Sequence, residues 1–113
     1  RDPAAEARAI ELLERFGLGD RTGEFPGTHS RGMRQKLALS LALALERPLT
    51  LLDEPFNALD IESQELLARL LRERCSGGGA VLLTGHQRDL ASFLDARVVA
   101  IRDGRLHLAL PGA

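Results

Sequence analysis

The chain has 113 residues, of which 44% are hydrophobic and 27% charged, and its formal net charge is −1. This composition is typical of a folded domain and argues against a disordered tail. No apolar run is long enough to span a membrane, and no global basic charge indicates nucleic acid binding. The single cysteine, Cys75, excludes an internal disulfide and a cysteine-cluster metal site. Because the chain starts at Arg1 and shows no signal peptide, we expect a piece of a longer protein.

The first expected element is a helix that starts at Asp2 and Pro3. The Asp2 side chain can accept from a free backbone N–H, and a proline costs nothing in the first turn. Apolar residues follow at helical spacing until Gly17, which is a typical helix end. Residues 18–29 are rich in Gly, Thr and Asp, which favours a loop.

Two further helices flank a short strand. Ser30 can cap the second helix, which must stop before Pro48. The apolar run 49–52 ends abruptly at two acidic residues, as in a parallel strand that is covered on both faces. Asp60 is expected to cap the third helix, which the glycines at 77–79 break.

The rest of the chain predicts shorter elements. We expect a buried strand over 80–84, a short helix over 87–95 and a strand over 98–102. Asp103 and Gly104 then indicate a hairpin turn, with alternating leucines beyond it. Helices that alternate with apolar strands predict an α/β fold with a mostly parallel sheet and a C-terminal hairpin.

The adjacent carboxylates Asp53 and Glu54 lie at the expected tip of a buried strand, where ligands bind in open α/β sheets. The pair suits Mg²⁺-dependent phosphate chemistry, with Asp53 holding the metal and Glu54 activating water. Taken alone, the two residues could equally open a loop or cap the next element.

The segment 28–36 (THSRGMRQK) puts a hydroxyl and a glycine at a helix N-terminus, which favours an anion such as phosphate. A plain serine cap at Ser30 is the simpler alternative. Gly27 and Gly32 have the spacing of a phosphate-binding P-loop, but Met33 and Arg34 replace its Lys and Ser/Thr, so we reject that interpretation. His86 follows the strand over 80–84 and could reach the same edge as Glu54, or could simply cap a helix.

Together these motifs resemble, in order and spacing, the C-terminal half of an ABC-type ATPase domain, a P-loop NTPase of the RecA-like type. The matching segments are the signature motif (30–35), the Walker B strand (49–54), the D-loop (57–60) and the switch histidine, His86. Arg31 and Met33 depart from the commoner Gly and Gln of the signature. By this resemblance residues 1–47 end the helical subdomain and residues 48–113 carry the Walker B, D-loop and H-loop half. The Walker A and glutamine-loop half is absent.

The resemblance implies ATP and Mg²⁺ as cofactors, although neither should bind tightly to these residues alone. It implies Asp53 as the metal ligand, Glu54 as the general base and His86 as a contact to the γ-phosphate. The nucleotide-binding residues that it implies, several of them acting on the partner's ATP, are Ser30, Arg31, Gly32, Met33, Gln35 and Asp60. The implied partners are a second nucleotide-binding domain and a transmembrane permease, at the cytoplasmic face of the membrane.

Three functions fit the resemblance. The first is the ATPase subunit of a membrane transporter, and residues 55–60 and 78–87 look most like heme-exporter and drug-exporter ATPases. The second is a soluble ABC ATPase that acts on nucleic acid or ribosomes, and the third is a binding module without catalysis. No nucleic acid partner is expected, and the intact Asp53, Glu54 and His86 argue against a degenerate module. The residues alone should be inactive and should self-associate, because strand edges and apolar faces are left open.

Overall fold

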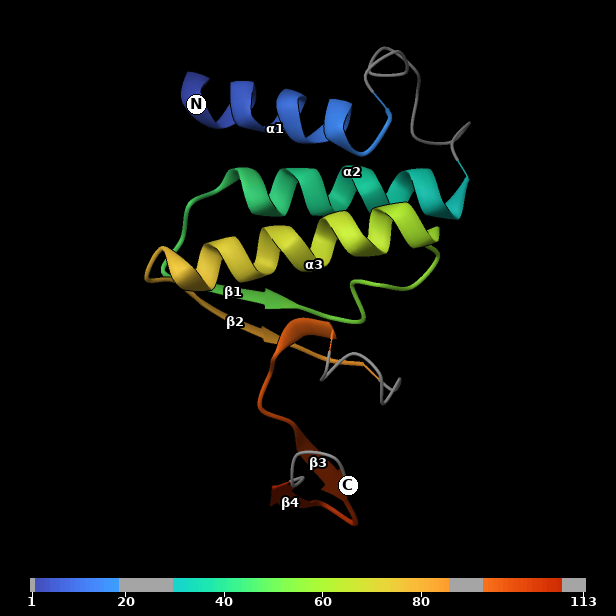
Figure 1. Cartoon of the computed structure of the whole chain (residues 1–113), viewed down its shortest axis with the longest axis vertical. Helices are drawn as coiled ribbons and strands as arrows, with labels where there is room; N and C mark the ends of the chain where they lie inside the picture. Colours follow the sequence, from blue (N-terminus) through green and yellow to red (C-terminus); the bar gives the residue numbers. More distant parts are fainter. Residues whose placement is uncertain (1, 19–29, 86–92, 109–113) are drawn as a thin grey trace.

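The computed structural model describes residues 2–18, 30–85 and 93–108. The helices are α1 (Pro3–Arg15), α2 (Arg31–Ala44) and α3 (Ile61–Ser76), and the strands are β1 (Leu49–Leu52), β2 (Ala80–Leu83), β3 (Val99–Arg102) and β4 (Arg105–Leu108). The three helices stack on one side of the β1–β2 pair, and the β3–β4 hairpin lies at the far end from α1 (Figure 1). The α/β class predicted from the sequence is confirmed.

The helix ends follow the sequence signals. The Asp2 carboxylate accepts from the Ala4 N–H at 3.0 Å, and the chain leaves α1 through Gly17 at a φ of 84°. At that positive φ a residue with a side chain would be strained. The Ser30 hydroxyl accepts from the Met33 N–H at 3.2 Å and so caps α2, as expected.

The core lies between the helices and the inner face of β1. It is built from Phe16, Leu39, Leu43, Leu52, Phe56, Leu59, Leu67, Ala68 and Leu71. The members from α2, α3 and β1 lie at positions that helical or strand periodicity places on the inward face, whereas Phe16, Phe56 and Leu59 lie outside the helices and strands. Leu67 and Ala68, in the middle of α3, are completely buried. Because Phe56 and Leu59 also belong to the core, the loop between β1 and α3 is fixed by hydrophobic burial.

The β1–β2 sheet is parallel, with Leu49 opposite Ala80 and Leu52 opposite Leu83. Its helix-facing side is covered, but Leu51 on the opposite side is 66% exposed. The prediction that this strand is covered on both faces is therefore wrong for the described residues. Among them, no helix packs on the outer face, so each second residue of β1 stays in solvent.

The hairpin β3–β4 is antiparallel and turns at Asp103 and Gly104, as the sequence predicts. In the described part of the chain it forms a sheet separate from β1–β2, not an extension of a single sheet. Its four strand positions on β4 are all exposed. Most of the helix expected over 87–95 lies outside the described residues, with only 93 and 94 seen to be helical.

Within the described ranges, none of the helices combines the length and the apolar character needed to cross a lipid bilayer.

Candidate functional site

The end of β1 and the end of β2 meet through one hydroxyl group. Thr84, directly after β2, accepts from the Glu54 N–H at 2.9 Å and donates to a carboxylate oxygen of Asp53. Because β1 and β2 are parallel neighbours in register, their carboxyl ends lie at the same edge. The Asp53–Glu54 pair is thus held at the sheet edge where α/β folds bind ligands.

The backbone of Glu54 adopts an unusual conformation. Its φ is 46°, in the left-handed region that costs a residue with a side chain about 1–3 kcal/mol. The Glu54 carboxylate accepts a hydrogen bond from the Asn57 side-chain amide. The side chain is therefore oriented locally, and its backbone conformation must be maintained by surrounding contacts.

The N-terminus of α2 lies against the loop that follows β1. A Cβ added at Gly32 would come within 2.8 Å of the Ala58 carbonyl oxygen, closer than real side chains approach a backbone atom. Ala58 is itself at a positive φ of 62°. Arg31, Arg34, Gln35 and Asn57 line a small cavity of about 230 Å³ beside this contact. Glycine at position 32 is therefore needed for helix and loop to meet.

Two side chains of α2 bind the same loop further along. The Gln35 amide donates to the Pro55 carbonyl at 2.8 Å and, less closely, to the Glu54 carbonyl at 3.3 Å. Lys36 Nζ lies 3.4 Å from Asp60 Oδ1. A hydrogen bond from Ser63 and the nearby Lys36 ammonium hold the pKa of the Asp60 carboxyl below its usual value. The loop between β1 and α3 is thus attached to α2 at several points.

The far end of α2 is anchored by two arginines from neighbouring helices. Arg74 of α3 donates to the Leu43 and Leu45 carbonyls, the latter at 2.9 Å, and to the Thr50 hydroxyl at 3.2 Å. Arg8 of α1 donates to the Ala44 carbonyl at 2.8 Å. These donors satisfy carbonyl groups that a helix C-terminus leaves unpaired, and they fix α2 between α1 and α3.

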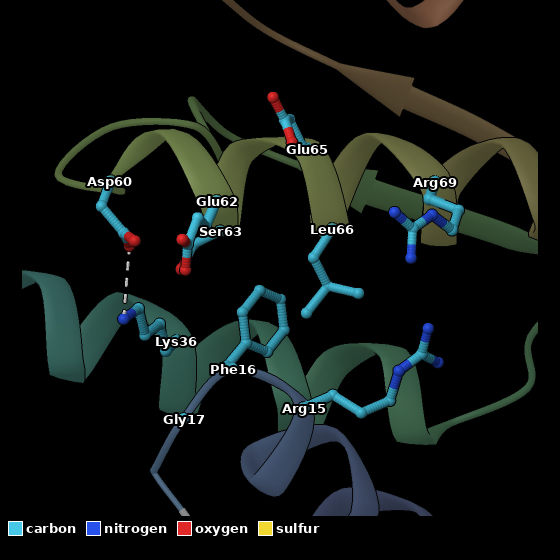
Figure 2. Close-up of a pocket in the computed structure, with 10 residues that line it drawn as sticks. All are labelled: Arg15, Phe16, Gly17, Lys36, Asp60, Glu62, Ser63, Glu65, Leu66 and Arg69. Atoms are coloured by element: carbon cyan, nitrogen blue, oxygen red, sulfur yellow. Dashed lines mark ion pairs between the residues drawn. The ribbon is translucent and has the colours of Figure 1, made fainter.

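A larger cavity of about 610 Å³ opens between the end of α1, α2 and the start of α3. Figure 2 shows the Lys36–Asp60 ion pair at one end of it, Phe16 and Leu66 facing each other across it, and the guanidinium groups of Arg15 and Arg69 at the other end. Its lining mixes both charge signs with apolar groups. The cavity shares Lys36, Asp60 and Ser63 with the contacts described above.

The structure brings most of the sequence-predicted residues into one region. Contacts connect Asp53, Glu54, Gln35 and Asp60, directly or through the loop, while Ser30 and Gly32 begin the helix that carries Gln35. Arg31 is exposed and Met33 half-buried in the first turn of α2. His86 lies outside the described residues.

Sequence reasoning missed the part played by two residues. The sequence pattern marks Thr84 only as the end of a strand and Asn57 only as part of a loop motif. Both residues nevertheless form hydrogen bonds with the Asp53–Glu54 pair. A hydroxyl residue at the tip of the neighbouring strand was the available signal for Thr84. The loop conformation that turns Asn57 back onto Glu54 has no local sequence signal, since Glu54 is not a residue type that favours positive φ.

The donor set at the sheet edge fits a magnesium ion bound together with phosphate. Among the described residues, no three His, Cys, Asp or Glu side chains converge as a protein-only metal site. Mg²⁺ is commonly held by one or two carboxylates plus substrate phosphates and water. The exposed Asp53 carboxylate, which accepts a hydrogen bond from Thr84 at one oxygen, has the chemistry that such a ligand requires.

Comparison with known sequences places these residues among nucleotide-binding proteins. Residues 8–91 match a family described as "AAA domain, putative AbiEii toxin, Type IV TA system". The chain is 44% identical over 107 residues to an aliphatic sulfonates import ATP-binding protein of Pseudomonas putida, covering 91% of this chain and 38% of that protein. It is 42% identical to a lipoprotein-releasing system ATP-binding protein of Caulobacter vibrioides, covering 92% of this chain and 46% of the relative.

A third relative is a macrolide export ATP-binding/permease protein of Paracoccus denitrificans, 41% identical over 91% of this chain and 15% of its own length. Among solved structures, the ATP binding subunit of an ABC transporter matches with a TM-score of 0.85 and 33% identity, covering 94% of this chain and 44% of that one. The chain thus spans less than half the length of these relatives.

Proposed function

Because the chain belongs to the AAA-domain family matched over residues 8–91 and to the ATP-binding proteins of ABC transporters, we propose that its full-length protein hydrolyses ATP to drive transport. The observation that carries this proposal is the Asp53–Glu54 pair, fixed by Thr84 at the sheet edge and joined through its loop to the N-terminus of α2. Phosphoryl transfer needs such positioned charges more than it needs covalent chemistry.

Each residue of the pair has a distinct proposed role. Asp53 would hold Mg²⁺, which supplies charge neutralisation to the phosphates when bound. Glu54 accepts the proton of the attacking water, and the Asn57 amide orients its carboxylate for this. His86 is proposed, from the family resemblance alone, to contact the γ-phosphate.

The N-terminus of α2 is the second half of the proposal. A helix N-terminus presents backbone N–H groups and the positive end of the helix dipole, which together favour an anion. Ser30, Arg31, Gly32 and Met33 form this first turn, and we assign them to the γ-phosphate of ATP held by a partner domain. Asp60, tied to α2 through Lys36, would relay the state of one site to the other.

The proposed partners are a second nucleotide-binding domain and a transmembrane permease, with the protein at the cytoplasmic face of the membrane. The relatives named above support transport over action on nucleic acid, since their names describe import, lipoprotein release and export. The division into a helical part (1–47) and a catalytic part (48–113) is likewise proposed.

The test is Glu54→Gln in the full-length protein. Glutamine keeps the shape and hydrogen bonding but cannot take a proton, so turnover should fall by about 10²–10⁴ while ATP binding persists. Because ATP then stays bound without being hydrolysed, the dimer should also accumulate. Glu65→Gln, an exposed position on α3, is the matched control and should keep normal turnover. Normal turnover of Glu54→Gln would refute the assignment.

A further inference from the structure

The side-chain amide of Gln35 is directed at the backbone of its own chain. It donates to two successive carbonyl groups, those of Glu54 at 3.3 Å and Pro55 at 2.8 Å. An amide NH₂ has two hydrogens, so one group can serve both acceptors. Gln35 is half-buried, which places this contact inside the junction between α2 and the loop.

These carbonyls belong to a segment that would not keep its conformation unaided. Glu54 has a φ of 46°, and such a residue persists in the left-handed region only where its surroundings over-determine it. Two side chains from different parts of the chain form hydrogen bonds with the Glu54 main chain. Thr84 accepts from its N–H at 2.9 Å, and Gln35 donates to its carbonyl. Pro55, next in sequence, is fully buried and leaves the segment little room to shift.

We propose that Gln35 is a positioning residue for the general base. It sets the backbone of Glu54 and Pro55, and through them the direction of the Glu54 carboxylate. This inference rests on the proposed function, in which Glu54 takes the proton of water. It replaces the nucleotide contact that the family resemblance implies for Gln35, because the amide donors are already used within the chain.

The experiment compares Gln35→Glu with wild type in the full-length protein. A carboxylate has the same shape but cannot donate, and it would face two carbonyl oxygens. We expect kcat to fall about 10- to 100-fold, the size of loss that a misplacement near 1 Å produces. The KM for ATP should stay within about twofold, because uniform binding is unaffected. Gln35→Met also lacks side-chain donors. If the glutamate variant is poorly folded, the methionine variant should show the same fall in kcat with an unchanged KM.

The matched control is Gln64→Glu. Gln64 also donates its amide to a carbonyl of the same loop, that of Leu59 at 3.2 Å, which stands at the α3 end of the loop, whereas Glu54 stands at the β1 end. Its kcat should stay near wild type. A comparable loss of kcat in this control would mean that general loosening of the loop is responsible, and the proposal would be wrong.

Two further measurements separate the possible failures. In the Glu54→Gln background, adding Gln35→Glu should leave ATP-driven dimerisation unchanged and lower the residual hydrolysis no further. Loss of dimerisation would assign Gln35 to the partner's nucleotide instead and overturn the proposal. Normal kcat in both Gln35 variants would also overturn it, whereas normal turnover in Glu54→Gln alone would refute the role of Glu54 itself.

Discussion

The close approach of α2 to the loop after β1 makes Gly32→Ala an informative change. The added Cβ would lie 2.8 Å from the Ala58 carbonyl oxygen, while ordinary contact begins at 3.4 Å, so a separation of 3.4 − 2.8 = 0.6 Å is missing. The obstacle is backbone, not the mobile end of a side chain. Ala58 is already at a φ of 62°, so the loop has little freedom to retreat.

The size of the effect follows from two opposing contributions. Forcing an extra methyl group into a close contact costs about 1–3 kcal/mol. Alanine gains up to about 1 kcal/mol over glycine through helix propensity, and less in a first turn. The free energy of unfolding should therefore fall by about 1–2 kcal/mol. Gly77→Ala is the control, because its Cβ would meet nothing closer than 3.5 Å. That change should stay within about 0.5 kcal/mol.

The assay is urea unfolding of the full-length protein, with ATP-driven dimerisation of the same variants in the Glu54→Gln background. We expect Gly32→Ala to lower the unfolding midpoint and to weaken dimerisation, since the first turn of α2 is displaced. If Gly32→Ala were as stable as wild type, or more stable, the close approach to Ala58 would not constrain the helix. The tight packing of α2 against the loop would then be wrong.

Arg74→Met should lower the free energy of unfolding by about 2–3 kcal/mol, because the Leu43 and Leu45 carbonyls lose a charged donor. Urea unfolding checks this, and Arg69→Met, at an exposed position of α3, should change little. The 113-residue chain produced alone should self-associate at micromolar concentration, since side chains such as Leu51 and Ile101 are 66% and 73% exposed. Light scattering from a stable monomer would contradict that expectation.

Short-range sequence signals predict much of the fold. The caps at Asp2 and Ser30 and the turn at Gly104 depend on side chains within three residues, so the sequence alone predicted them. The outer face of β1 was predicted wrongly because an apolar run shows that burial is needed but not what supplies it. In the described residues, nothing covers Leu51.

The candidate site was likewise predicted only in part from the sequence. The adjacent carboxylates and the helix N-terminus were visible as motifs, whereas the contacts that arrange them join residues far apart in the chain. Thr84 bonds Glu54 across 30 positions and Gln35 bonds Pro55 across 20. The hydroxyl of Thr84 at a strand tip marks a candidate in the sequence, but the partners of Thr84 and Gln35 are seen only in the packed arrangement of β2, α2 and the loop.

These long-range contacts have a mechanical consequence for α2. Arg8 and Arg74 fix its C-terminal end, and Gln35 and Lys36 tie its N-terminal half to the loop between β1 and α3. Sharp bends in helices have local causes such as proline, and the 14 residues of α2 include no proline, so we expect a ligand that displaces the first turn to move more of the helix than that turn. We expect such a movement to reach the loop, in which Glu54 and Ala58 both hold positive φ values. We therefore expect anion binding at the helix N-terminus to be coupled to the placing of the proposed base through the contacts of α2 with this loop.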